Sequence, residues 1–270
     1  QIRAEQATSP LSPIDGFIPL GNPATDAVIA SPDRHLPEPE QLQWLRDGLA
    51  APGRPWHLVG NQVMVTPVRY PGAALGLSGV FINADQWDGY AVDQAALLGH
   101  LAAQPASSGD AVVLTGDIHS SWGADLPVAV NPATGAYTPV GVEFVTPSVT
   151  SDGFYEIVRG FYPSLPAESA VAVTGQVTGA VQQVNPWVRY LNGIGHGYTV
   201  IDVTPERVQA DFHHTPLPSS AAPDPRVDPT RPTSVVNATN ATAVQKHPSA
   251  ATAARLDQAK VESGSPARPH

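Results

Sequence analysis

Asp117 and His119 are the residues whose types and spacing best suit metal chemistry, and they follow directly after the apolar run at 111–114. A carboxylate binds hard cations such as Ca²⁺, whereas an imidazole suits first-row transition ions. In extended backbone, residues two apart point to the same side, so we predict that these two side chains converge. The pair therefore suits a two-metal centre in which each residue binds one ion and the ions activate water against a phosphoryl group.

The same Asp-x-His triplet also has a purely structural interpretation. An Asp at the end of a strand commonly caps the next turn, with the His packed beneath it. Two ligands do not complete a metal site, so these residues alone leave both interpretations open. Ser120 and Ser121 come next in the chain, but they lack the G-x-S-x-G setting of a catalytic serine, and we do not interpret them as nucleophiles.

Three further residues are candidates for contact with a substrate. Trp122 either packs in the core or forms a pocket wall that stacks on a cationic headgroup. His196 lies between two glycines, which allow close backbone approach, and it is either a structural imidazole or a hydrogen-bonding partner near the site. Tyr155 lies in the stretch TSDGFYEI, which we interpret as a pocket loop. No catalytic residue is assigned beyond the metal ligands.

Alternating helices and strands must position these residues. In the first predicted helix Pro39 suits the first turn, and Leu42, Leu45 and Leu49 recur at helical spacing beside Trp44, so we expect that face to be buried. Within residues 31–214 the predicted elements are two helices, at 36–53 and 91–104, four strands, at 56–68, 111–116, 140–149 and 170–177, and a β-hairpin at 197–214. This alternation predicts an α/β (α+β layered) domain.

Composition divides the chain into three parts. Residues 1–30 are rich in Pro, Gly and Asp and are expected to be extended. The chain opens at Gln1 with neither Met nor a signal segment, so we expect a cleavage site before it. Residues 31–214 are the predicted folded domain, and residues 215–270 form a Pro-, Ser-, Thr- and Ala-rich tail in which 250–263 could form a short helix.

Charge and residue usage exclude several classes of protein. The net charge of −10 argues against a nucleic-acid partner, and the absence of cysteine excludes disulfides and thiolate metal ligands. No stretch approaches the ~18 consecutive apolar residues of a transmembrane segment. The abundance of Pro and Gly, with few Lys, favours a secreted, extracellular protein.

Several stretches together resemble the C-terminal half of the catalytic domain of alkaline phosphatase D (PhoD-like) metallophosphoesterases. They arrive in family order between Pro32 and His214, which makes the set far more specific than any one motif. The stretches are SPDRHLPEPEQLQWLRDGLA, WHLVGNQVMVTPV, INADQWDGY, VVLTGDIHSSWGADL, GVEFVTPSVTSDGF and NPWVRYLNGIGHGYTVIDVTPERVQADFHH.

The resemblance implies a calcineurin-like metallophosphoesterase fold, a β-sandwich flanked by helices. It also implies that Asp117 serves one metal position and His119 the other. The implied cofactors are two divalent or trivalent metal ions, iron with calcium first, with zinc and manganese as alternatives. The composition is compatible with all of them, since nitrogen and carboxylate ligands do not select one metal.

The upstream ligand motifs of that family are missing from this chain. Members carry a bridging Asp followed by Tyr, and an Asp-Asp-His-Glu stretch with a nearby Asn, and neither pattern occurs here. We therefore expect the N-terminal half of the same precursor to be a separate chain that completes the site as a heterodimer. The tail at 215–270 is expected to pack on that partner.

The predicted function is a secreted two-metal phosphoesterase. The resemblance favours a phosphodiesterase of the glycerophosphoethanolamine ethanolaminephosphodiesterase type, acting on glycerophosphodiesters or phospholipid headgroups. An alkaline phosphomonoesterase of the same family is the alternative. A different class, a secreted binding or scaffold module in which Asp117 and His119 merely cap a strand, also stays open.

Overall fold

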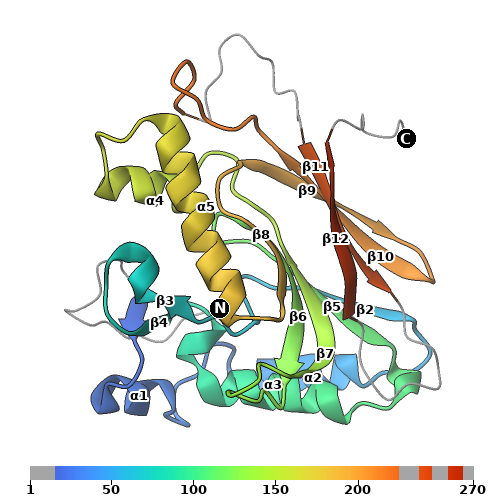
Figure 1. The fold of residues 1–270 in the computed structure, drawn as a ribbon. Coiled ribbons are helices and arrows are strands. Elements are labelled where there is room, and N and C mark those ends of the chain that lie inside the picture. Colours follow the sequence, from blue (N-terminus) through green and yellow to red (C-terminus); the bar gives the residue numbers. More distant parts are fainter. Residues whose placement is uncertain (1–15, 225–236, 245–254, 264–270) are drawn as a thin grey trace.

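A five-stranded sheet lies at the centre of the computed structural model, which describes residues 16–224, 237–244 and 255–263 (Figure 1). Its strand order is β2-β5-β7-β6-β8, with β2, β5 and β7 parallel and β6 antiparallel to both of its neighbours. The strands are β2 (Trp56–Gly60), β5 (Asp110–Thr115), β6 (Ser121–Val128), β7 (Thr138–Val145) and β8 (Val188–Asn192). The parallel strand β5 is buried almost throughout, as the apolar run predicts.

A second sheet packs on one face of the first. Its antiparallel strands run in the order β12-β11-β10-β9 and are β9 (Gly197–Val203), β10 (Arg207–His214), β11 (Asn237–Val244) and β12 (Arg255–Ser263). Between the two sheets, Val112, Val142 and Phe144 pack against Val208 and Phe212. Each such side chain contributes about 2 kcal/mol through burial, so this layer holds the sandwich together.

Helices cover the opposite face of the central sheet. α2 (Pro39–Leu49) and α3 (Ala91–Ala103) pack their leucines on Ala111 and Val113 of β5 and on Leu126 of β6. The alternation along β5, with Val112 toward the second sheet and its neighbours toward the helices, is what a strand buried on both faces requires.

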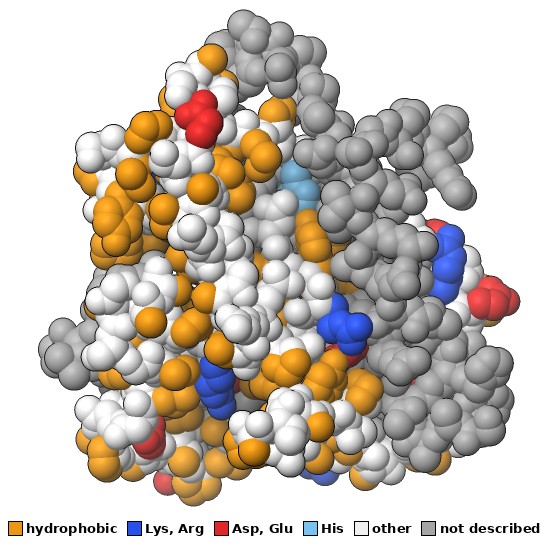
Figure 2. Space-filling view, in the orientation of Figure 1, with side chains coloured by type: hydrophobic (Ala, Val, Ile, Leu, Met, Phe, Trp, Pro, Cys, Tyr) orange, Lys and Arg blue, Asp and Glu red, His pale blue; other side chains and the backbone are white. Residues whose placement is uncertain are grey.

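A third, smaller layer closes the molecule beside β8. The sheet β1-β4-β3 is formed by Phe17–Pro19, Val80–Asn83 and Tyr70–Pro71, and the remaining helices are α1 (Pro23–Ile29), α4 (Phe154–Phe161), α5 (Ala167–Val184) and the short η1 (Gly72–Leu75), η2 (Trp87–Gly89) and η3 (Ala106–Ser108). In Figure 2, hydrophobic side chains gather over α4 and α5. In the part of the chain that the structure describes, no helix combines the length and apolarity needed to cross a membrane.

The predicted layered α/β class is confirmed, together with the helices at α2 and α3, the strands β2, β5 and β7, and the β9–β10 hairpin. The strand predicted at 170–177 is wrong, because these residues lie inside α5. Buried positions of α5 include Ala170, Thr174, Val177 and Val181, which recur at helical spacing. The eight residues at 170–177 are too few to distinguish helical spacing from the alternating pattern of a strand.

Other boundaries also differ from the sequence-based predictions. The helix predicted at 250–263 is wrong, because Arg255–Ser263 forms β12, paired with β11. The strand predicted over 56–68 ends at Gly60, and the predicted loop at TSDGFYEI contains the start of α4. Trp44 does not share the buried face of α2, since 73% of it is exposed.

Candidate metal site and its supporting loop

The backbone of the Asp117–His119 turn is left-handed at both residues. β5 ends at Thr115, and φ is 73° at Asp117 and 56° at His119. The extended conformation predicted here is therefore wrong. Left-handed geometry costs roughly 1–2 kcal/mol at a residue with a side chain, and such strain is held at functional sites by the surrounding structure.

Ile118 anchors this turn from within. Its side chain packs on the core that includes Met64 and Trp122, and its amide donates to the Gly116 carbonyl oxygen at 2.9 Å. Asp117 is exposed and His119 is half-buried. The turn thus holds an inward apolar side chain between two residues that bear a carboxylate and an imidazole near the surface.

The orientation of the His119 ring is set by the Asp152 backbone. The Nδ1 atom of His119 lies 2.8 Å from the Asp152 carbonyl oxygen. A carbonyl oxygen only accepts, so Nδ1 is the donor in this contact, and in the neutral ring the lone pair is on Nε2. A histidine that binds a metal is held in this way, with its other ring nitrogen donating to a carbonyl or carboxylate.

His196 holds the loop that carries Asp152. It is 2% exposed, and its ring contacts the Ser148 hydroxyl through Nδ1 at 3.0 Å and the Glu156 carboxylate through Nε2 at 3.2 Å. Glu156 in turn accepts a hydrogen bond from the Gly153 amide at 2.8 Å, at the start of α4. His196 therefore affects the position of His119 indirectly, through the loop that carries Asp152.

The charge on Glu156 belongs to the same network. Burial alone would raise the pKa of Glu156, but the hydrogen bonds from His196 and from the Gly153 amide outweigh it, and the pKa is lowered. Glu156 therefore remains a carboxylate acceptor under neutral conditions, and the start of α4 stays fixed against His196.

Gly153 allows the site turn and α4 to approach closely. A Cβ added at Gly153 would lie 2.6 Å from the carbonyl oxygen of His119, a contact that real Cβ atoms do not make. The backbone of His119 is thus in direct contact with the first residue before α4. Any side chain at 153 must push the His119 turn away from the Asp152 carbonyl.

Trp122 lies beneath the site and has no exposed surface. Its Nε1 donates to the Ser120 hydroxyl at 2.7 Å, and its ring lies 6.3 Å from that of Phe154. Of the two roles considered for Trp122, this placement favours packing.

Tyr155 lies on the wall of an open groove lined by Asp152, Arg159 and Asp224. Its ring is almost wholly buried, and its hydroxyl donates to the Pro223 carbonyl at 2.8 Å. Arg159 brings a cationic side chain to the groove, although its Nη1 also donates to the Leu165 carbonyl at 2.8 Å. The groove therefore adjoins the loop that holds His119.

Glu143 fixes the end of β5 just before the site. It is fully buried, and its Oε1 accepts from the Thr115 hydroxyl and the Val65 amide, while Oε2 accepts from the amide and hydroxyl of Thr66. Burial raises the pKa of Glu143, against the effect of these four hydrogen bonds. The carboxylate joins β7, β5 and the segment after β2 at one point.

His213 and His214 end β10, and both are buried. The Nε2 of His214 lies 2.8 Å from the Ser121 hydroxyl. Burial, with a smaller effect of His213, lowers the pKa of His214 to about 4. This Ser–His contact is buried, so neither side chain is open to solvent.

The donor set at the turn suits a metal but is incomplete. Within residues 16–224, 237–244 and 255–263, no three His, Cys, Asp or Glu side chains are grouped so that they could hold an ion. A carboxylate and an imidazole with an oriented Nε2 fit as part of a centre whose other ligands come from elsewhere.

Sequence reasoning did not identify Ser148, Glu156 or Glu143 as supports of the site. Glu156 had a usable signal, because an acidic residue three positions after a helix N-cap commonly binds back to the cap amide. The other two contacts join residues far apart in the chain and have no local pattern.

Comparisons with known proteins agree with this fold. A family profile described as PhoD-like phosphatase matches residues 1–212. Alkaline phosphatase D of Bacillus subtilis (strain 168) is 27% identical over 197 residues, covering 73% of this chain and 30% of that protein. A solved structure described as "Structure of PhoD" superposes with a TM-score of 0.62 at 22% identity, covering 91% of this chain and 39% of that one. The last likeness shows the shared fold, and the chain spans less than half the length of either protein.

Proposed function

Because the chain belongs to the PhoD-like phosphatase family, we propose that it forms part of a metal-dependent phosphoesterase whose ions are bound by Asp117 and His119. The observation that carries this proposal is the hydrogen bond from His119 Nδ1 to the Asp152 carbonyl, at 2.8 Å. With Nδ1 donating to a carbonyl, the neutral ring leaves Nε2 as the nitrogen that can bind a metal ion, which is the arrangement of metal-binding histidines.

Each residue of the site has a distinct part in the proposed reaction. Bound metal ions would neutralise phosphate oxygens and lower the pKa of a coordinated water. The Asp117 carboxylate supplies negative charge for one ion, and His119 supplies a neutral nitrogen for the other. His196 is a positioning residue that acts through Glu156 and the loop. The groove beside Tyr155 offers room for the ester, and Arg159 is the cationic side chain in a lining that also includes Asp152 and Asp224.

We further propose that the remaining ligands lie on the N-terminal half of the same precursor, present as a separate chain. Support comes from the site turn, because Asp117 and His119 need further ligands and no three metal-binding side chains are grouped in the described part of the chain. Support also comes from β2, a parallel strand at the edge of the central sheet, where 47% of Leu58 is exposed. Parallel sheets are normally covered on both faces and at their edges, so this edge suits a partner strand.

For the substrate, we propose a phosphodiester in preference to a phosphomonoester, in a secreted enzyme with iron and calcium, or alternatively zinc or manganese. The support is the sequence resemblance alone. Parallel assays of the purified complex on bis-p-nitrophenyl phosphate and p-nitrophenyl phosphate test it, and faster turnover of the monoester would reject the preference.

The central test removes the His119 imidazole. We expect His119→Ala to reduce the content of one metal, measured by elemental analysis of the complex, and to lower turnover by at least a hundredfold while thermal unfolding changes little. His100→Ala, on α3, is the matched control and should keep both metal and turnover. Full metal content and turnover in His119→Ala would instead favour the non-catalytic binding module.

A further inference from the structure

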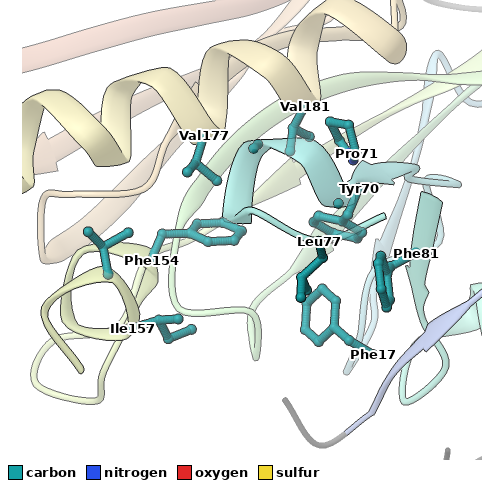
Figure 3. Close-up of a pocket in the computed structure, with 12 residues that line it drawn as sticks. Phe17, Tyr70, Pro71, Leu77, Phe81, Phe154, Ile157, Val177 and Val181 are labelled. Carbon is teal, nitrogen blue, oxygen red and sulfur yellow. The ribbon is translucent and has the colours of Figure 1, made fainter. Parts of the chain in front are cut away.

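The groove beside Tyr155 has two walls, and one of them is α4, which contributes Tyr155 and Arg159 to the lining. The position of α4 is fixed by packing on α5. Phe154 and Ile157 point from α4 into an apolar space that Val177 of α5 also lines (Figure 3). This wall of the groove is therefore part of the folded core of the chain.

The second wall is the segment 215–224, which follows β10 and which we call the strap. Pro223 and Asp224 of the strap line the groove together with α4. The strap contains no helix or strand, and its one local pairing is a bridge between Ser219 and Ala222. Its position therefore depends on contacts with the rest of the chain.

Two side chains of the helices hold the far end of the strap. Glu168, in the first turn of α5, accepts from the Ser220 amide through Oε1 and from the Ser220 hydroxyl through Oε2, both at 2.7 Å. The Tyr155 hydroxyl donates to the Pro223 carbonyl at 2.8 Å. Hydrogen bonds to a carboxylate are stronger than neutral ones, so Glu168 is the main attachment.

The strap begins at the residue that also holds the loop of the candidate metal site. The Thr215 amide donates to the His196 carbonyl at 2.7 Å, and the Thr215 hydroxyl accepts from the His196 amide at 3.2 Å. The ring of His196 contacts Ser148 and Glu156, which fix the loop that carries Asp152. The groove is thus bounded by segments that share one support with that loop.

The size and lining of the groove indicate what it can hold. Its accessible volume is about 360 Å³, near the lower end of the range typical of ligand sites, which gives room for one ring-sized group. Pro163 and Pro223 add apolar surface, and the Arg159 guanidinium can attract the face of an aromatic ring. The carboxylates of Asp152 and Asp224 disfavour a further anionic group.

We propose that the strap makes the site selective for phosphate esters whose organic group is an uncharged ring, held between the strap and α4. Glu168 and Ser220 are positioning residues, because they fix this wall without being part of the groove lining. The proposal rests on the proposed phosphoesterase function and adds to it the class of ester.

The test compares two inhibitors of the purified complex, phenylphosphonate and methylphosphonate, at an alkaline pH at which both are dianions. The reporter reaction is hydrolysis of whichever nitrophenyl ester the complex turns over faster. We expect phenylphosphonate to bind about tenfold or more tightly than methylphosphonate. Glu168→Ala should reduce this preference by about threefold or more, because a loosened wall must be ordered on binding, while the methylphosphonate affinity and kcat stay within about twofold.

Variants of the strap itself provide the controls. Ser220→Ala removes one of the two bonds to Glu168 and should have a smaller effect, whereas Ser220→Thr keeps the hydroxyl and should behave as the wild type. Ser219→Ala is the matched control, because Ser219 pairs with Ala222 through its backbone. Hydrogen exchange of the strap amides gives a readout that does not depend on activity. It should be about tenfold or more faster in Glu168→Ala than in Ser219→Ala.

Three results would overturn the proposal. They are equal affinities of the wild-type complex for the two phosphonates, an unreduced preference for phenylphosphonate in Glu168→Ala, and equal hydrogen exchange of the strap in Glu168→Ala and Ser219→Ala. Each of these leaves the phosphoesterase function standing. An absence of hydrolysis of both nitrophenyl esters by the wild-type complex would instead reject that function, and the class of ester with it.

Discussion

At the scale of single residues, Gly153 and Glu143 determine how the backbone of the site turn is held. Gly153 permits contact with the His119 carbonyl, and Glu143 receives four hydrogen bonds at the end of β5. Neither residue is a proposed ligand. Both residues hold the backbone in place. Replacing them therefore tests how the proposed ligands are positioned without removing a ligand.

Gly153→Ala should displace the His119 turn, because its new Cβ meets a backbone oxygen at 2.6 Å and a main chain cannot move aside cheaply. We expect the metal content of the purified complex to fall, measured by elemental analysis, with turnover reduced at least tenfold. Gly160→Ala is a matched control on α4, since nothing lies within 4 Å of its added Cβ. It should retain metal and gain about 0.5–1 kcal/mol of stability. Equal metal content in both variants would contradict the positioning role of Gly153.

Glu143→Gln should destabilise the chain by on the order of 3 kcal/mol, measured by urea unfolding. The amide nitrogen of Gln cannot accept, so at least one of the buried donors from Val65, Thr66 and Thr115 loses its partner. Glu206→Gln, in the exposed β9–β10 turn, should change stability by less than about 0.5 kcal/mol. If the two variants unfold alike, Glu143 does not hold the strands as described.

At the scale of elements, Asp88 of η2 ties the segment after β2 to α3. Its carboxylate accepts from the Val68 amide at 2.8 Å and from Gln94 at 3.2 Å, and it lies 3.6 Å from Arg69. Burial raises the pKa of Asp88 from 3.8 to about 6, although the charge of Arg69 and the hydrogen bonds act in the opposite direction. The contact between α3 and the segment after β2 is therefore sensitive to pH.

The sign of this sensitivity follows from the raised pKa. The folded chain binds the Asp88 proton more tightly than the unfolded chain, so this contribution to stability is complete below pH 3.8 and is lost as the pH rises through 6. We expect the stability of the wild type relative to Asp88→Asn to fall by on the order of 2–3 kcal/mol over this interval, measured by denaturant unfolding at each pH. A difference that is constant, or that rises with pH, would contradict the assignment.

The sequence predicted elements well where a local pattern was long or strongly apolar. The caps and leucine spacing of α2 and the run of β5 are such cases. It failed at α5, whose small and β-branched residues suit either period, and at β12, whose strand form depends on pairing with β11. At the candidate site, it predicts Asp117 and His119 as ligands, and that assignment stays a prediction. It does not predict their left-handed backbone, which is held by the packing of Ile118 and by contacts with Asp152 and Gly153, more than thirty residues away in the chain.

At the scale of the whole molecule, the feature that bears on the proposed companion chain is β2, the edge strand of the central sheet. A groove lined by Pro37, Gln41, Trp44 and Leu58 runs along α2 and β2. Trp44 is 73% exposed, and an aromatic side chain so exposed beside an open sheet edge suits an interface anchor. This surface is where we place the proposed companion chain.

Trp44→Ser should weaken association with the companion chain by about tenfold or more, measured by analytical ultracentrifugation, while the unfolding midpoint of this chain alone stays within a degree or two. The reason is that Trp44 has little contact with its own chain to lose. Tyr162 is also exposed but does not line the groove that contains Trp44 and Leu58. Tyr162→Ser is therefore the control and should leave association unchanged. If Trp44→Ser associates as tightly as the wild type, the interface lies at another surface.

The left-handed turn at residues 117–119 affects how readily metal ions would bind there. Because Ile118, the Asp152 carbonyl and the start of α4 already impose the shape of residues 117–119, an arriving cation does not have to order this segment. Such preorganisation lowers the entropic penalty of binding. The turn should therefore keep the same conformation with and without its ions, and the affinity of the centre should depend chiefly on assembly of the complete ligand set.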